Sequence, residues 1–178
     1  MARRQRSFTE EDFESLEGRA SKSEQKRAVQ RMAALGEQLA ALPKKQIEKL
    51  PVEDRLIDAL LELQTISSHE ARRRQCQRIG KLLRNEDEST ILSYLTPKQG
   101  MKKQAQLMRW VDRMIEQGEP AIKEFMKTYN AAEHHAIRQH LLRIERDKKK
   151  ELGEDAVVAS RQRLVNYVQQ VALISDQG

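Results

Sequence analysis

The sequence predicts an all-α protein, an elongated helical bundle of about six to eight helices. Apolar residues recur along most of the 178-residue chain at the spacing of amphipathic helices, and no segment alternates with the period of two that a strand requires. Charged residues make up 34% of the chain and aromatic residues only 4%, which suits long exposed helices better than a sheet. We therefore expect two helical subdomains joined through a long helix.

The first helix is expected to begin after Ser21, because Ser21 and Glu24 have the spacing of a capping box. Its apolar face consists of Val29, Met32, Leu35 and Leu39. Pro43 ends this helix, since proline cannot continue it. A short helix over 44–50 is expected next, and a second proline closes it.

A long helix is expected from residue 53 onwards, because Glu53 and Asp54 place two acids in its first turn, where the helix dipole favours them. Its two halves carry different apolar stripes, which are Leu56, Leu60 and Leu63 in the first half and Cys76, Ile79 and Leu83 in the second. At about 100° per residue, the second stripe is turned by roughly 165° from the first. Either the helix bends near Ser67 and Ser68, or its halves pack against different neighbours.

The rest of the chain is predicted to continue as helices separated by turns. A turn over 85–88 comes first, Gly118 is well placed as a C-cap, and Gly153 separates the last two helices. The expected helical stretches are 89–95, a helix through 107–115 that ends at Gly118, one that starts at Glu119 and Pro120, 131–150, and a last one through 157–174.

These elements predict three parts of the chain. Residues 1–20 are expected to be a flexible or weakly ordered N-terminal arm, because they mix charges with few apolar positions. Residues 21–97 are expected to form an N-terminal helical subdomain that contains a basic helix. Residues 98–178 are expected to form a C-terminal helical subdomain.

Several classes of protein are disfavoured by composition. The single cysteine excludes an internal disulfide, and Cys76 is interpreted as a small buried residue rather than a reactive thiol. No hydrophobic run approaches the roughly 20 residues that span a bilayer, and the basic N-terminus lacks the apolar core of a signal peptide. We expect a cytoplasmic protein that does not bind membranes.

No pattern in the sequence predicts an enzyme. The run Glu133-His134-His135 lacks a second ligand four residues from either histidine, so a metal site is not expected there. There is no glycine-rich phosphate loop and no nucleophile elbow. We therefore expect no catalytic residues, no cofactor and no small-molecule substrate.

The segment 70–84 holds six basic residues and a single acid, and this density indicates a nucleic-acid contact. On a helix, Arg74, Arg78 and Lys81 form one stripe, opposite the apolar stripe of the same segment. The planar guanidinium of arginine matches the oxygens of a phosphate. Arg72 falls near the apolar stripe, so its alternative role is to neutralise a carboxylate at the edge of the core.

A second basic cluster lies on the first helix, where the alternative of a plain solvated face stays open. It consists of Lys22, Lys26, Arg27 and Arg31. Aromatic residues are nearly missing near both clusters, which favours recognition of the backbone and shape of a folded RNA over base stacking. A further run over 148–150 is interpreted as a solvated helix end. The predicted RNA-binding residues are Lys22, Lys26, Arg27, Arg31, Arg73, Arg74, Arg78, Lys81 and Arg84.

Two stretches of the chain, 21–36 and 70–84, resemble the YjgA/DarP family of dual-action ribosomal maturation proteins. The run Arg72-Arg73-Arg74-Gln75 and the run Ile79-Gly80-Lys81 carry most of this resemblance. It implies an all-α cytoplasmic protein without catalytic chemistry. It also implies association with late precursors of the large ribosomal subunit and help in maturing the peptidyl transferase region. The resemblance also implies that six matched positions face RNA: Lys22, Lys26, Arg27, Arg73, Arg74 and Lys81.

The sequence departs from the family pattern in three places. A larger aliphatic residue is expected at Cys76 and an aliphatic one at Arg78, so the role of Arg78 rests on the stripe alone. The arm over 1–20 is also less acidic than the family pattern implies. We expect a monomeric, non-enzymatic assembly factor that binds rRNA on large-subunit (50S) precursors. The alternative is a basic helical adaptor for acidic protein partners. Binding of double-stranded DNA ranks third, because no short recognition-helix unit is evident.

Overall fold

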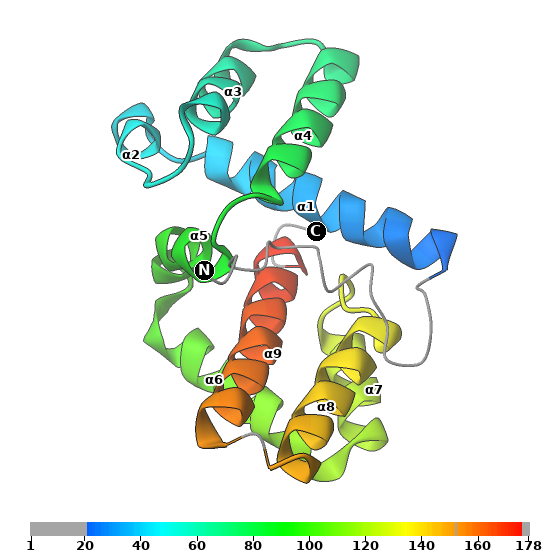
Figure 1. Ribbon diagram of the computed structural model, residues 1–178. Helices are drawn as coiled ribbons and strands as arrows, with labels where there is room; N and C mark the ends of the chain where they lie inside the picture. Colours follow the sequence, from blue (N-terminus) through cyan, green and yellow to red (C-terminus); the bar gives the residue numbers. More distant parts are fainter. Residues whose placement is uncertain (1–20, 152, 176–178) are drawn as a thin grey trace. The chain divides into compact units, whose positions relative to one another are not determined.

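The computed structural model describes residues 21–151 and 153–175, and these residues fold into nine α-helices and one 3₁₀ helix without any strand (Figure 1). The prediction of an all-α protein is confirmed. The arm predicted over residues 1–20 lies outside the described residues. The helices are α1 (Lys22–Ala40), α2 (Lys44–Glu48), α3 (Asp54–Thr65), α4 (His69–Leu83), α5 (Glu88–Leu95), η1 (Thr96–Gln99), α6 (Gly100–Gln117), α7 (Glu119–Thr128), α8 (His134–Lys149) and α9 (Glu154–Ser175).

The chain divides into two compact units, and the described residues of unit 1 are 21–95 and those of unit 2 are 96–151 and 153–175. The division falls between α5 and η1. The prediction of a long helix that joins two subdomains is therefore wrong, because the chain passes from unit 1 to unit 2 where α5 is followed directly by η1.

The predicted long helix is two separate helices, α3 and α4, which pack against each other. Ile66 leaves the helical conformation with ψ 125°, and Ser68 is extended before α4 begins. The break has a physical reason in the two apolar stripes, which lie on nearly opposite sides of a straight helix. Folding α4 back along α3 lets both stripes face α1, and it raises the number of helices above the predicted range.

Unit 1 is built on a close crossing of α1 and α4. A Cβ atom added to Gly36 would lie 2.5 Å from Cγ2 of Ile79, and one added to Gly80 would lie 3.1 Å from the backbone nitrogen of Ala33. These contacts place residues 32–36 of α1 against residues 79–83, the C-terminal part of α4. The unit's core contains Met32, Leu35, Leu39, Leu56, Leu60, Leu63, Ile79 and Leu83, each at most 1% exposed.

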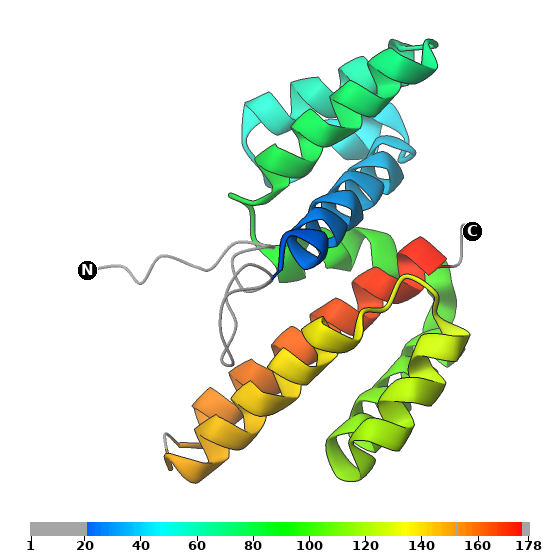
Figure 2. The same cartoon turned by 90° about the vertical axis from the view of Figure 1, so that its right-hand side faces the viewer.

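Unit 2 packs α6, α7, α8 and α9 around a second core. α8 and α9 are antiparallel neighbours in both views (Figures 1 and 2). Gly118 has φ 67° and ends α6, as the sequence predicts, because this conformation is unfavourable for residues with a Cβ. Tyr129 is buried in this core, and Trp110 packs against it from a half-buried position.

Candidate nucleic-acid interface

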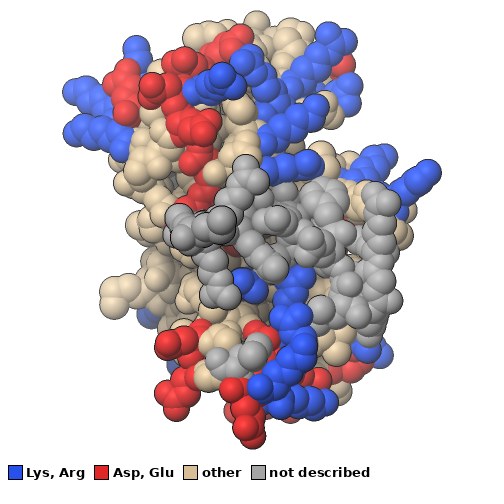
Figure 3. Space-filling view, in the orientation of Figure 1, with Lys and Arg blue, Asp and Glu red and all other residues tan. Residues whose placement is uncertain are grey.

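The exposed face of α4 carries four cations, Arg73, Arg74, Arg78 and Lys81, which we call the arginine surface. The opposite face is buried through Ile79 and Leu83, as the predicted stripes require. The side chains of Arg73, Arg74 and Arg78 are 57%, 75% and 62% exposed, so their guanidinium groups face solvent. Figure 3 shows basic side chains gathered over α4.

Two carboxylates partly balance the arginine surface. Glu70, in the first turn of α4, accepts a hydrogen bond of 2.8 Å from Arg73 and lies 3.4 Å from Arg74. Hydrogen bonding and the charge of Arg73 lower the pKa of Glu70. Glu62 of α3 lies 3.9 Å from Arg78. Exposed pairs of this kind contribute little to stability, so the guanidinium groups can exchange a carboxylate for a phosphate.

Lys81 completes the surface; it is exposed and forms no ion pair with another described residue. Two carboxylates face four cations, which leaves the surface with a net positive charge. A net positive helix face that is rich in arginine attracts a polyanion and positions its phosphates.

Arg72 does not belong to this surface, because its side chain points toward the contact between α3, α4 and α1. Its Nη1 donates hydrogen bonds of 3.0 Å to the carbonyl oxygens of Leu63 and Ile66, at the C-terminal end of α3. Its Nη2 lies 3.8 Å from Glu37 of α1, which agrees with the alternative role that the sequence suggests. Arg72 therefore satisfies helix-end carbonyls and fixes the turn that orients α4.

Gln75, one turn further along α4, has a matching structural role. Its amide donates to the carbonyl oxygen of Ala59 at 2.9 Å and to Glu62 at 3.2 Å. The side chain is buried, so these bonds replace the water that it loses on folding. Together, Arg72 and Gln75 hold α4 at a fixed rotation on α3, and this rotation keeps the arginine surface outward.

Cys76 is half-buried between α4 and α1. Burial and the nearby Glu37 raise the pKa of its thiol, and Arg72 opposes this only in part. A thiol with a raised pKa is a poor nucleophile at neutral pH. The structure thus supports the interpretation of Cys76 as a packing residue.

In the basic cluster predicted on α1, three residues are exposed and one is buried. Lys22, Lys26 and Arg27 are exposed near the N-terminal end of α1, where the predicted capping box is present and Glu24 accepts from the backbone N–H of Ser21 at 2.6 Å. Arg31 differs, because it is only 5% exposed.

The reason for the burial of Arg31 is its spacing along the helix. It lies three residues after Ala28 and four before Leu35, both of which are buried, so position 31 falls on the packed face of α1. We leave it out of the proposed interface. Arg84, the C-cap of α4, is half-buried and stands at the edge of the arginine surface.

Three lysines that the sequence-based prediction did not single out are also exposed in unit 1. They are Lys44, Lys45 and Lys49, on and just after α2. A signal for them exists in the sequence, because two apolar residues, Ile47 and Leu50, anchor a short segment that is otherwise polar and bounded by prolines. We call these three residues the lysine cluster.

Apart from the basic surfaces, the described part of the chain offers few arrangements that could bind a metal or enter a membrane. No group of three metal-ligating side chains occurs there, and His134 instead forms a 2.6 Å contact with Glu119. None of the helices that the structure describes has the length and apolarity to cross a bilayer.

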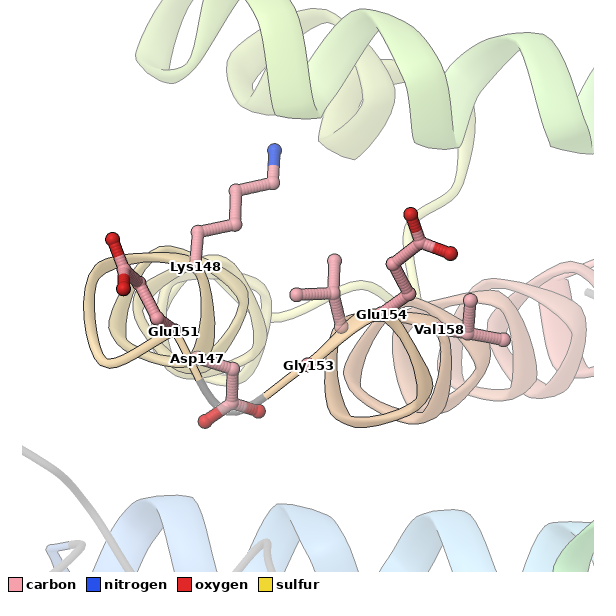
Figure 4. Close-up of a pocket in the computed structure, with 7 residues that line it drawn as sticks. Asp147, Lys148, Glu151, Gly153, Glu154 and Val158 are labelled. Carbon is pink, nitrogen blue, oxygen red and sulfur yellow. The ribbon is translucent and has the colours of Figure 1, made fainter.

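An open groove of about 540 Å³ lies at the turn between α8 and α9 (Figure 4). Lys148 and Glu154 project on the same side of the two helix ends, and Val157 and Val158 add apolar lining. The buried carboxylate of Asp147 points away from them and accepts hydrogen bonds from Ser160 and Arg146. Its hydrogen-bonding capacity is thus used within the fold, and the groove has no nucleophile or paired acid and base.

The fold and its exposed surfaces therefore define a helical protein with a cationic face suited to nucleic acid. Comparison with known proteins identifies the family of this chain. Residues 18–169 match the family model described as "Dual-action ribosomal maturation protein DarP", and the chain belongs to this family.

Three relatives carry the same description. The protein from Nitrosomonas europaea is 40% identical over 137 residues, which cover 74% of this chain and 76% of the relative. The protein from Vibrio parahaemolyticus is 37% identical over 134 residues, 72% of this chain and 76% of the relative. The protein from Pasteurella multocida is 35% identical over 158 residues, 86% of this chain and 84% of the relative. The resemblance seen in the sequence is confirmed, and the family is one of ribosomal maturation proteins rather than enzymes.

Proposed function

We propose that this protein is a non-enzymatic assembly factor that binds rRNA on late precursors of the large ribosomal subunit and promotes maturation of the peptidyl transferase region. The arginine surface carries this proposal, because it presents three guanidinium groups and one ammonium group on a single rigid helix face. The description of the relatives as ribosomal maturation proteins supports an RNA-rich partner. The factor acts in the cytoplasm and as a monomer.

The mechanism is selection of a conformation. Arg73, Arg74 and Arg78 exchange their exposed contacts with Glu70 and Glu62 for contacts with phosphates, and Lys81 adds a further charge. Binding is tightest when neighbouring rRNA helices are in a near-mature arrangement, so the factor shifts the precursor ensemble toward that arrangement. Release follows when the mature surface no longer favours the factor.

The first test is a sucrose gradient of native lysate at low and at high salt, with the protein followed by immunoblot. Comigration with large-subunit particles at low salt, lost at high salt, is expected, because phosphate contacts weaken as counterions compete. A protein that stays at the top of the gradient under both conditions would overturn the proposal.

The second test separates the arginine surface from the net charge of the chain. The variant R73A/R74A/R78A is expected to lose comigration while keeping its helicity. The matched control is K148A/K149A/K150A, which removes three exposed charges from unit 2 and is expected to comigrate normally. Equal behaviour of the two variants would place the RNA contact elsewhere.

A second candidate is an adaptor for acidic proteins, because the arginine surface already accepts the carboxylates of Glu70 and Glu62. Nuclease treatment of the native complex distinguishes the two functions. Dissociation on nuclease treatment supports the contact with rRNA, and persistence of the complex supports the protein adaptor.

A further inference from the structure

The lysine cluster lies on and just after a short helix that is anchored to the core of unit 1. Ile47 and Leu50 are 0% and 4% exposed, so α2 is anchored from below. The amide of Gln64, on α3, donates to the carbonyl oxygens of Ala40 and Leu42 at 2.9 and 3.0 Å, which fixes the corner between α1 and α2. The lysines are thus presented from a rigid support rather than from a free loop.

Nearby carboxylates neutralise little of the positive charge of the three lysines. Lys44 lies 3.9 Å from Glu48, but the two side chains are 71% and 48% exposed, and such a pair is weak. Lys45 and Lys49 are exposed and form no ion pair with a described residue. The cluster therefore carries a local excess of positive charge.

The lysine cluster and the arginine surface lie on different sides of α3. α2 and α4 each pack against α3, and in Figure 1 α3 stands between them. The exposed side of α3 carries three carboxylates, Asp54, Asp58 and Glu62, against one cation, Arg55, so it is acidic overall. Figure 3 shows basic side chains over α2 and over α4, with acidic side chains between them.

This arrangement opposes one continuous RNA path across unit 1. A phosphate backbone that ran from the arginine surface to the lysine cluster over α3 would meet the carboxylates, and like charges repel. Two separate RNA segments, one on each side, each meet a surface on which cations outnumber carboxylates. Lysine is also suited to contact phosphates as a point charge, without the geometry that arginine demands.

We propose that the lysine cluster is a second phosphate-binding surface, through which unit 1 bridges two separate RNA helices. The inference rests on the proposed function, because it takes the first helix to be bound at the arginine surface. It adds a partner surface, namely a second double-stranded RNA segment contacted through its backbone. Holding two helices at once would fix their mutual position, which contact with one helix cannot do.

The test is a bridging assay with two RNA duplexes, each about 20 base pairs long, so that each exceeds the footprint of a small double-strand-binding domain. One duplex is immobilised and the other is fluorescent, and the full chain is added. Wild-type protein is expected to capture the fluorescent duplex. The variant K44Q/K45Q/K49Q is expected to lose capture by about tenfold or more, with less than about threefold loss of binding to a single duplex.

The matched control is K148Q/K149Q/K150Q, which removes the same charge and is expected to bridge normally. Bridging that survives in the K44Q/K45Q/K49Q variant, or that is lost equally in the control, would overturn the inference. Capture that requires two chains per particle in light scattering would overturn it as well. Wild-type protein that binds a single duplex without bridging refutes this inference alone, whereas failure to bind any duplex refutes the proposed function.

Discussion

Replacing Gly36 by alanine is expected to destabilise unit 1 by forcing α1 away from α4. The new Cβ would lie 2.5 Å from Cγ2 of Ile79, about 1 Å inside the ordinary carbon–carbon contact of about 3.5–4.0 Å. The methyl group of Ile79 is attached near the backbone and is fully buried, so it cannot rotate away. The helices must therefore move apart by roughly that overlap.

The magnitude follows from two opposing effects. Overpacking a core costs about 1–3 kcal/mol, and alanine is better than glycine in a helix interior by up to about 1 kcal/mol. The expected net loss in the free energy of unfolding is about 1–2 kcal/mol. Urea unfolding followed by far-UV circular dichroism measures it, and the fluorescence of Trp110 reports separately on unit 2.

A double-mutant cycle tests the cause. Ile79→Ala alone is expected to cost about 2–5 kcal/mol, because it empties a fully buried site. Gly36→Ala in that background meets no Cγ2 atom, so the double variant is expected to lose at least about 1 kcal/mol less than the sum of the two single variants. Strict additivity, or a Gly36→Ala variant as stable as the wild type, would refute the contact as the reason.

Three further predictions concern charged side chains. Arg72→Ala is expected to cost about 1–2 kcal/mol in thermal unfolding, because it removes two hydrogen bonds to carbonyl oxygens from a partly solvated guanidinium, whereas Arg74→Ala is expected to change stability by less than about 0.5 kcal/mol; equal effects would contradict the assigned roles. Burial raises the pKa of Asp147, but hydrogen bonds from Ser160 and Arg146 outweigh it and the pKa is lowered overall. The ionised carboxylate therefore stabilises the fold above its ordinary pKa, and this contribution is lost as the pH falls through the lowered value. The stability gap between wild type and Asp147→Asn should accordingly be larger at pH 7 than in strong acid, and a gap that does not change with pH would contradict this. If the four cations of the arginine surface each contact a phosphate, the logarithm of RNA affinity should fall with the logarithm of salt concentration with a slope of about −3.6, and Lys81→Ala should reduce the slope by about 1; fluorescence anisotropy with an RNA duplex measures both, and a flat salt dependence would exclude phosphate contacts.

The candidate site was only partly predictable. The stripe of Arg74, Arg78 and Lys81 is a property of one helix, and the structure leaves all three exposed. The inward role of Arg72 depends on carbonyl oxygens at the end of α3, which come within reach only because the chain reverses between the two helices. The lysine cluster gains its separate position from the packing of α2 on α3, which no local pattern contains.

Local patterns in the sequence predict the all-helical class and most helix ends. The capping box of Ser21 and Glu24 and the C-cap at Gly118 depend on hydrogen bonds and backbone sterics within a few residues, so their pattern predicts them directly. Local patterns do not contain the break after Thr65 or the close crossing at Gly36 and Gly80. These features depend on contacts between segments far apart in the chain, whose free energy outweighs local helical preference once two apolar stripes must be buried against the same helix.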